Sequence, residues 1–258
     1  MSFQQEALIS SPYISSYLLL WIRFGFMIFF IIACYFTYVE RQDDPVHILN
    51  TLSFQTMLAN AFFFLLIIVF TFCRCATVAD LSNTRYDSLS EHHPLTFSMK
   101  SYRQWMPYII YMAWDVLVPT SFFVTLIYWG LSHDSVSFSS IAMHLTNSVA
   151  FGFELAITRI LPSKGHIFVL WLLASAFLVH MYFYYETLGI FIYEHFDFEE
   201  KMSNIVIWPG SVVFLTLLFF SIWGIQLGKS VHTDDFAVYV PVSVPEVRFH
   251  HVEMKNFA

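Results

Sequence analysis

A histidine, an asparagine and a glutamate lie inside a largely apolar stretch at residues 136–157, which includes the sequence SIAMHLTNSVAFGFE. They are His144, Asn147 and Glu154. Because offsets of three and seven residues return to the same side of an α-helix, the three residues share one face. An ionisable group at membrane depth costs about 2.5–3.5 kcal/mol, so it usually faces the interior of a helix bundle and is a candidate functional group. We therefore expect this face to point inward.

A histidine in that position can act as a general base that activates a serine or threonine hydroxyl for attack on an ester. Candidate hydroxyls lie at the start of the apolar stretch 52–73, at Ser53 and Thr56. His144 lies about eight residues, or roughly 12 Å, below the outer end of its own stretch. Ser53 and Thr56 are expected within a turn or two of that depth. The simpler alternative is a hydrogen bond between helices, worth about 0.6 kcal/mol on average in a membrane. From spacing alone, this structural role is favoured.

Other ionisable residues lie inside apolar stretches at different depths. Asp115 and Glu154 are expected in the cytosolic half of the membrane, away from the histidine, so a histidine–hydroxyl dyad is expected rather than a triad. Arg159 lies five residues after Glu154 and is the expected ion partner of that carboxylate. Arg23 lies a few residues inside the first stretch and is expected to extend its head group back to the cytosolic side.

The composition indicates an integral membrane protein. Of the 258 residues 57% are hydrophobic, 20% are aromatic and only 12% are charged, and the mean hydropathy is +0.62. A soluble domain usually carries about 25% charged residues. A helix spans a bilayer with about 20 apolar residues, and six stretches reach that length, namely 17–38, 52–73, 106–130, 136–157, 166–193 and 205–227. The expected fold is therefore all-α, with six transmembrane helices in one bundle.

The basic residues predict how this bundle is oriented. One side carries Arg74, Arg85, Lys100, Arg103, Arg159, Lys164, Lys229, Arg248 and Lys255. The opposite side carries only Arg41 and Lys201. This positive-inside bias predicts that both termini are cytosolic, with a cytosolic N-terminus at 1–16, a cytosolic loop at 74–105 and a flexible cytosolic tail at 228–258. No signal peptide is evident, and both the plasma membrane and the endoplasmic reticulum fit the pattern.

No cofactor and no metal ion are expected. His92 and His93 are adjacent, but they lack the helical spacing or the cysteine partners of a metal site. The sequence has no glycine-rich nucleotide-binding loop, and nothing in it indicates a nucleic acid partner. The expected partners are the lipid bilayer itself and, if the protein is an enzyme, a lipid ester substrate.

Five short motifs resemble a known family. LSFQTMLANAFFF, RQWMPYII, FFVTLIYW, MHLTNS and TLGIFIY occur in the order and at the spacing seen in the androgen-induced gene family of six-span membrane proteins, to which the rolling stone proteins are related. The resemblance covers roughly residues 17–227. It implies a six-span bundle of the same type.

The resemblance also implies an activity. Characterised members of the family hydrolyse fatty acid esters of hydroxy fatty acids with a membrane-embedded threonine early in the second span and a histidine in the fourth. The motif match places the histidine on His144 and the threonine on Ser53, where a serine is chemically competent. A shift of register would assign the hydroxyl role to Thr56 or Thr51. If the protein is such an enzyme, Asn60 or Asn147 is the expected amide donor to the bound ester.

Two non-enzymatic alternatives stay open at this point. An asparagine three residues after the histidine, here Asn147, resembles the rolling stone branch, which is linked to myoblast fusion and implies a role in fusion, adhesion or scaffolding. A transporter or channel would use the ionisable residues Asp115, His144, Glu154 and His180 as a polar path. This last alternative ranks lowest because paired glycine or proline interruptions of the helices are not evident.

Overall fold

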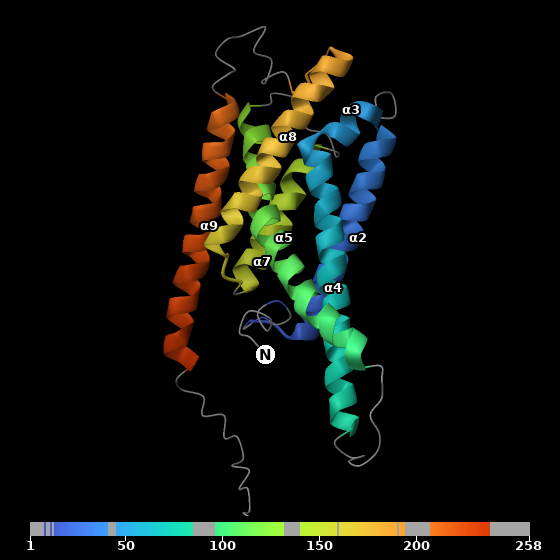
Figure 1. Ribbon diagram of the computed structural model, residues 1–258, viewed down its shortest axis with the longest axis vertical. Helices are drawn as coiled ribbons and strands as arrows, with labels where there is room; N and C mark the ends of the chain where they lie inside the picture. The colour runs from blue at the N-terminus through green and yellow to red at the C-terminus, as the bar shows by residue number, and fades with distance from the viewer. Residues whose placement is uncertain are drawn as a thin grey trace, which may run out of the picture.

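A computed structural model describes residues 8, 11, 13–40, 45–84, 96–131, 140–158, 160–189, 191–193 and 207–237. This part of the chain is helical and contains no strand. The elements are α2 (Ser16–Glu40), α3 (Pro45–Asn50), α4 (Leu52–Thr84), α5 (Thr96–Leu131), the π-helical turn η1 (Ile141–Leu145), α7 (Thr146–Ile157), the 3-10 turn η2 (Lys164–His166), α8 (Ile167–Leu188) and α9 (Ile207–Ala237) (Figure 1). The predicted all-α class is confirmed.

Five of these helices are long and apolar enough to cross a membrane. The spans are Ser16–Glu40, Leu52–Cys73, Trp105–Gly130, Lys164–Leu188 and Pro209–Lys229. The apolar segment Ile141–Ile157 is shorter than a full span, and the beginning of the predicted stretch 136–157 lies outside the described residues. The structure therefore establishes a multi-pass helical bundle, and the count of six spans stays a prediction.

Three helices continue beyond the stretches predicted to span. The backbone of α4 stays helical to Thr84 and that of α5 begins at Thr96, so most of the loop expected at 74–105 is helix. Helix α9 runs to Ala237, which corrects the expectation of a flexible tail from residue 228. Hydropathy marks only the apolar part of a helix, and a helix whose backbone hydrogen bonds are internal can continue into the polar surroundings.

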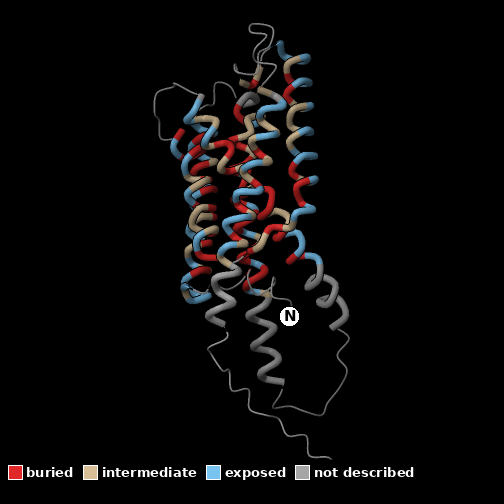
Figure 2. The backbone as a smooth tube through the Cα atoms, turned by 90° about the vertical axis from the view of Figure 1, so that its left-hand side faces the viewer, coloured by how far each residue is buried: buried red, intermediate tan, exposed pale blue. Residues whose placement is uncertain are grey.

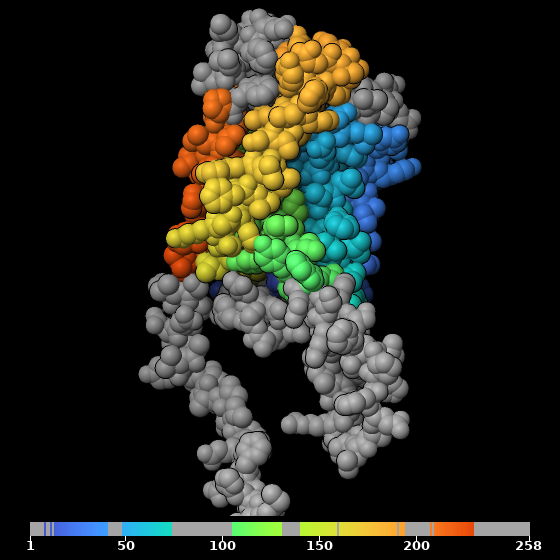
Figure 3. All heavy atoms as spheres, viewed as in Figure 1, coloured from blue at the N-terminus to red at the C-terminus, as the bar shows by residue number. Residues whose placement is uncertain are grey.

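Helix α5 lies at the centre of the bundle. It contacts α4, α7, α8 and α9, while α2 packs along α4. Helix α8 crosses the face turned toward the viewer in Figures 1 and 3 and packs against α5 and α9. We call the end of the bundle where α4 begins the Ser53 end, and the opposite end, where α7 finishes, the Glu154 end.

Helix α2, at the edge of the bundle, is buried on one side only. In α2 the buried residues are Leu19, Arg23, Met27, Phe30, Ala33 and Thr37. Their spacing of three and four residues makes a single stripe along the helix, and Figure 2 shows buried residues facing the interior of the bundle and exposed residues facing outward. The exposed side of α2 includes large apolar residues such as Tyr17 and Trp21. An apolar outer surface of this kind is compatible with a lipid environment.

Aromatic rings fill the centre of the packing between α2, α4 and α7. The Phe30 and Phe64 rings stack with centroids 5.9 Å apart, and the Phe151 ring lies 5.5 Å from Phe63 and 5.7 Å from Phe64. All four side chains are fully buried. The phenylalanine run in AFFFLLIIVF therefore serves as the core that fixes α4 and α7 side by side.

Candidate functional site

His144 lies in the single turn of π-helix that precedes α7. The turn η1 is closed by a hydrogen bond from the Thr146 N–H to the Ile141 carbonyl. Such π turns inside α-helices are rare and frequently occur at functional sites. The residue is only 6% exposed, and Asn147 and Glu154 are buried as well. The prediction that this face points into the bundle is confirmed.

Ser53 meets this histidine across the interface between α4 and η1. Ser53 Oγ and His144 Nδ1 are 3.3 Å apart, and Ser53 is 5% exposed. For Nδ1 to accept the serine proton, the imidazole must carry its own proton on Nε2. The two residues are 91 positions apart in the chain, and their contact has the arrangement of a nucleophile beside its base.

The beginning of α4 is fixed by Thr51. The Thr51 hydroxyl donates to the Ile48 carbonyl at 2.9 Å and accepts from the Phe54 N–H at 3.3 Å, which is the usual role of an N-cap threonine. Ser53 therefore lies in the first turn of the helix, where the macrodipole favours negative charge. Thr51 serves to start the helix, and its hydroxyl is committed to that role.

Thr56, the second candidate hydroxyl, lies about one turn further along α4 and is also buried. A residue three positions on rises about 4.5 Å along the helix axis. The structure records the hydroxyl contact of the histidine ring with Ser53. Ser53 is therefore in position to transfer its proton to this histidine.

Two residues of α5 support the histidine from the other side. The Tyr128 ring stacks on the His144 ring with centroids 3.5 Å apart and planes inclined by 5°. The Thr125 hydroxyl donates to the His144 carbonyl and accepts from Ser148 Oγ at 2.7 Å. The ring orientation and the backbone of the π turn are thus both held by α5. Sequence reasoning did not identify Tyr128, because a tyrosine in an apolar helix carries no signal of its own.

Tyr193 reaches the same place from the end of α8. The helix was expected to continue to residue 193, but it ends at Leu188, where Gly189 adopts φ 69° and donates its N–H to the Tyr185 carbonyl. This left-handed position is the usual glycine C-cap. Beyond it the chain turns back, and the Phe191 ring stacks on that of Tyr185 with centroids 4.1 Å apart.

The returning chain places the Tyr193 phenol at the start of α4. Its oxygen accepts from the Leu52 N–H at 2.8 Å. Burial raises the pKa of Tyr193, and the hydrogen bond from the Leu52 N–H offsets part of that rise. The phenol therefore stays protonated and keeps a proton to donate. The glycine in TLGIFIY could have indicated the end of the helix, but nothing in the sequence placed Tyr193 at the start of α4.

The two buried asparagines bind helices to one another. Asn60 Nδ2 donates to Asn147 Oδ1 at 2.8 Å and to Ser121 Oγ at 3.1 Å, and Asn147 Nδ2 donates to the Met143 carbonyl at 2.6 Å. Asn60 is seven residues from Ser53, which is about 10 Å along a helix. Asn60 is therefore about two turns away from Ser53, and both amides are engaged in hydrogen bonds of their own.

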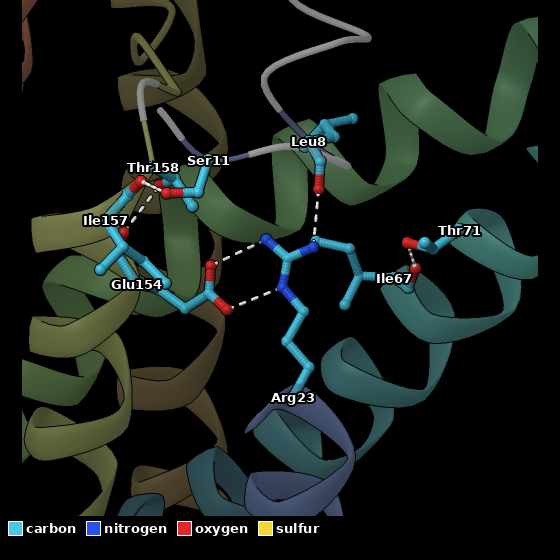
Figure 4. Close-up of polar contacts among 8 residues, drawn as sticks. All are labelled: Leu8, Ser11, Arg23, Ile67, Thr71, Glu154, Ile157 and Thr158. Carbon is cyan, nitrogen blue, oxygen red and sulfur yellow. Dashed lines mark hydrogen bonds and ion pairs between the residues drawn. The ribbon is translucent and has the colours of Figure 1, made fainter. Parts of the chain in front are cut away.

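Glu154 forms a buried ion pair with Arg23, which corrects the expectation that the Arg23 head group extends to the cytosolic side. Arg23 Nε and one terminal nitrogen donate to the two carboxylate oxygens at 2.8 and 2.9 Å, and its other terminal nitrogen donates to the Leu8 carbonyl at 2.8 Å (Figure 4). Arg23 is 1% exposed and Glu154 is 0% exposed. Arg23 therefore points into the bundle rather than toward water, and the proposed partner Arg159 lies outside the described residues.

The remaining ionisable residues also have partners of their own. Asp115 Oδ2 lies 2.6 Å from His166 Nδ1 and accepts from the Ser163 N–H at 2.9 Å. His180 Nε2 lies 2.8 Å from Asn50 Oδ1. Asp115 and Glu154 are thus paired away from His144, as expected. The four residues considered as a polar path are held in four separate contacts, which gives a transport pathway no support.

An apolar groove opens on the flank of the bundle between α2 and the start of α7. It has a volume of about 400 Å³ and is lined by Ile22, Gly25, Phe26, Phe29, Leu145, Thr146 and Val149. Two of these, Leu145 and Thr146, directly follow His144 in the chain. The lining is uncharged, so the groove suits a hydrocarbon chain better than a polar head group.

Comparison with known proteins identifies no relative: no family model, no curated protein and no solved structure matches the chain.

Proposed function

We propose that the chain is a membrane-embedded hydrolase of the androgen-induced and rolling stone type, which cleaves lipid esters such as fatty acid esters of hydroxy fatty acids. Ser53 is the nucleophile and His144 is the general base. The acyl chain of the substrate lies in the apolar groove between α2 and α7. The reaction uses no metal ion and no cofactor.

The contact between Ser53 Oγ and His144 Nδ1 at 3.3 Å carries the proposal. A serine hydroxyl is a weak nucleophile unless a neighbouring base accepts its proton. Here the base is buried, is held by stacking on Tyr128, and faces a hydroxyl in the first turn of a helix, where a developing negative charge is favoured. Motif order along the chain, described above, independently selects the same histidine and the same serine.

The reaction proceeds in two steps. In the first, Ser53 transfers its proton to His144 Nδ1 while Oγ attacks the ester carbonyl, and the resulting tetrahedral intermediate expels the alkoxide of the hydroxy fatty acid, which takes the proton from the imidazolium. In the second, a water molecule gives a proton to His144 and attacks the acyl-serine. Collapse of this intermediate releases the fatty acid and returns the proton to Ser53.

The location follows from the basic residues. We place both termini in the cytosol, in either the plasma membrane or the endoplasmic reticulum, because basic residues collect in cytosolic segments. Ser53 then lies in the half of the bilayer opposite the cytosol. A protease-protection assay on sealed microsomes checks this orientation: a tag at either terminus is removed by added protease if the termini are cytosolic.

The activity is tested on the purified protein reconstituted in phosphatidylcholine vesicles. A fatty acid ester of a hydroxy fatty acid is supplied, and released fatty acid is measured by mass spectrometry. Hydrolysis by the wild type should fall to background in Ser53→Ala and in His144→Ala. Thr56→Ala is the matched control, since it removes a buried hydroxyl from the same helix one turn away. A His144→Ala protein that hydrolyses the ester at the wild-type rate contradicts the proposal.

A second candidate function is supported by the asparagine contacts. The network of Asn60, Asn147 and Ser121 joins three helices, and the histidine–serine contact adds a further bond between helices. This is the arrangement expected of a non-enzymatic membrane protein in cell fusion, adhesion or scaffolding, in which polar groups bind helices together. A well-folded protein without hydrolase activity, whose His144→Ala variant still supports cell fusion, would favour it.

A further inference from the structure

We propose that Ser11 is a phosphorylation site, and that a phosphate at this position releases the N-terminal segment from the Glu154 end of the bundle. The phosphoryl donor is ATP, and the modifying enzyme is a proline-directed protein kinase. The Ser11 hydroxyl oxygen forms a bond to the γ-phosphorus of ATP, the bond from that phosphorus to the bridging oxygen breaks, ADP leaves, and the hydroxyl proton passes to water. This inference rests on the cytosolic termini proposed above, where ATP is available, and does not depend on the hydrolase activity.

Two hydrogen bonds hold the N-terminal segment on the bundle (Figure 4). The Ser11 hydroxyl donates to the Ile157 carbonyl at 2.7 Å, and the Leu8 carbonyl accepts from Arg23 at 2.8 Å. Leu8 is 1% exposed, whereas Ser11 is only partly buried. The segment therefore lies against the end of α7 and against the buried ion pair of Arg23 with Glu154.

Ser11 completes the cap at the end of α7. The last carbonyls of a helix have no partner inside it, and this end carries a partial negative charge. Lys229 of α9 donates to the carbonyls of Ala156 and Thr158 at 2.9 Å each. The Ile157 carbonyl, which lies between them in the chain, accepts from Ser11 Oγ. Ser11 thus contributes a proton donor at a place that favours donors and positive charge.

A phosphate reverses the character of this contact. Phosphoserine carries about −1.5 to −2 charge at pH 7, and at a helix C-terminus such a group is repelled. The dianion has no proton to donate to the Ile157 carbonyl, and the Glu154 carboxylate lies about one turn earlier in the same helix. An ammonium group has three N–H donors, and those of Lys229 are directed to three carbonyls. We therefore expect the modified segment to leave the bundle.

The sequence favours Ser11 over other hydroxyls as the modified residue. Pro12 follows Ser11, and it is the only one of the nine prolines in the chain that a serine or threonine precedes. A residue before proline is disfavoured in the helical conformation and prefers an extended one, which is the form in which kinases bind their substrates. Ser11 lies outside the helices, before α2 begins at Ser16.

The first experiment measures whether Ser11 accepts a phosphate. The detergent-purified chain is incubated with a proline-directed kinase and Mg-ATP, and phosphopeptides are mapped by mass spectrometry. A synthetic peptide of residues 1–16 shows that the kinase accepts the sequence. We expect one phosphate on Ser11, which is absent in Ser11→Ala. A folded protein that stays unmodified while the peptide is phosphorylated overturns the inference.

The second experiment measures release of the segment by chymotrypsin cleavage after Leu8. Because Leu8 is 1% exposed while the segment is bound, the cleavage rate reports the population of the detached form. Ser11→Ala loses only the hydrogen bond and should be cleaved about 5-fold faster than the wild type. The phosphorylated protein and Ser11→Asp should be cleaved about 10-fold faster still, because they add charge repulsion.

Ser15→Asp is the matched control for charge in the same segment. Ser15 is exposed, and its Oγ accepts from the Leu18 N–H at 3.2 Å. Aspartate fills such a helix-capping role as well as serine does, so this variant should be cleaved at the wild-type rate. Equal acceleration by Ser15→Asp and Ser11→Asp would show that charge alone loosens the segment and would overturn the role of the Ser11 contact.

The outcomes separate this inference from the proposals on which it rests. Cleavage of the phosphorylated protein at the wild-type rate, or more slowly, overturns release, because the phosphate is then held in place, for example by Lys229. Both experiments use purified protein and require no ester hydrolysis, so a failed hydrolase proposal leaves them intact. Non-cytosolic termini in the protease-protection assay would remove the source of ATP and overturn the inference independently.

Discussion

The Tyr128 ring lies flat on the His144 ring, with centroids 3.5 Å apart and planes within 5° of parallel. Face-to-face stacking of two neutral rings is not their preferred arrangement, because the electron-rich faces repel. A cation over a tyrosine face is attracted to it by about 0.5–2 kcal/mol. The stack is therefore more favourable when the histidine has accepted a proton, as it does in the proposed transition state. Interactions that strengthen in the transition state accelerate the chemical step.

This relationship predicts different results for two substitutions at Tyr128. Tyr128→Phe keeps a ring face over the imidazole and should retain most of the hydrolysis rate. Tyr128→Leu removes the face and should lower kcat about 5- to 30-fold, the equivalent of about 1–2 kcal/mol. Steady-state hydrolysis in vesicles measures both. Equal rates for the two variants would show that the stack only fills space.

The buried pair of Arg23 and Glu154 predicts a large effect on stability. Arg23→Met leaves a carboxylate without its partner inside the bundle and should lower the free energy of unfolding by about 3–5 kcal/mol. The double variant Arg23→Met with Glu154→Leu removes both charges and should recover most of that loss. Unfolding by SDS titration in mixed micelles, followed by circular dichroism, measures the difference. A double variant no more stable than the single one would contradict this account of the pair.

Gly189, whose backbone is in the left-handed conformation, ends α8 just before the segment that carries Tyr193 to the start of α4. We therefore expect a substitution at Gly189 to affect the site. Gly189→Ala places a side chain at φ 69°, a conformation that costs about 1 kcal/mol for residues other than glycine. Because Tyr193 is positioned by the chain that follows this turn, we expect a lower unfolding midpoint together with a lower kcat. Gly165→Ala, in the turn η2, is the control at a glycine without a positive φ. A change in stability alone, with full kcat, would separate the turn from the site.

Hydropathy predicted where most of the helices lie, because in lipid the apolar composition of a helix is imposed by the surrounding solvent. The span Leu52–Cys73 agrees with the stretch predicted at 52–73. The predicted end of α8 was five residues too late, because the segment around Gly189 stays apolar after the helix ends. Helix caps depend on single residues, and a 20-residue hydropathy pattern averages over them.

The site was predictable only in part. Helical periodicity correctly placed His144 on an inward face, but residue spacing could not select Ser53, which lies 91 positions away. The motif resemblance suggested that pairing. The partner of Glu154 is 131 positions away, and only the packing of α2 against the bundle determines it. Long-range contacts of this kind leave no periodic signal in a single sequence.

The most direct test of the central claim is labelling with a fluorophosphonate, which phosphonylates an activated serine or threonine. The detergent-purified wild type is labelled alongside Ser53→Ala, Thr56→Ala and His144→Ala, and the adduct is mapped by mass spectrometry of proteolytic peptides. We predict an adduct on Ser53 that is retained in Thr56→Ala and lost in both Ser53→Ala and His144→Ala. A folded, monodisperse wild type that takes no label would contradict the claim and would leave His144 as a bond between helices.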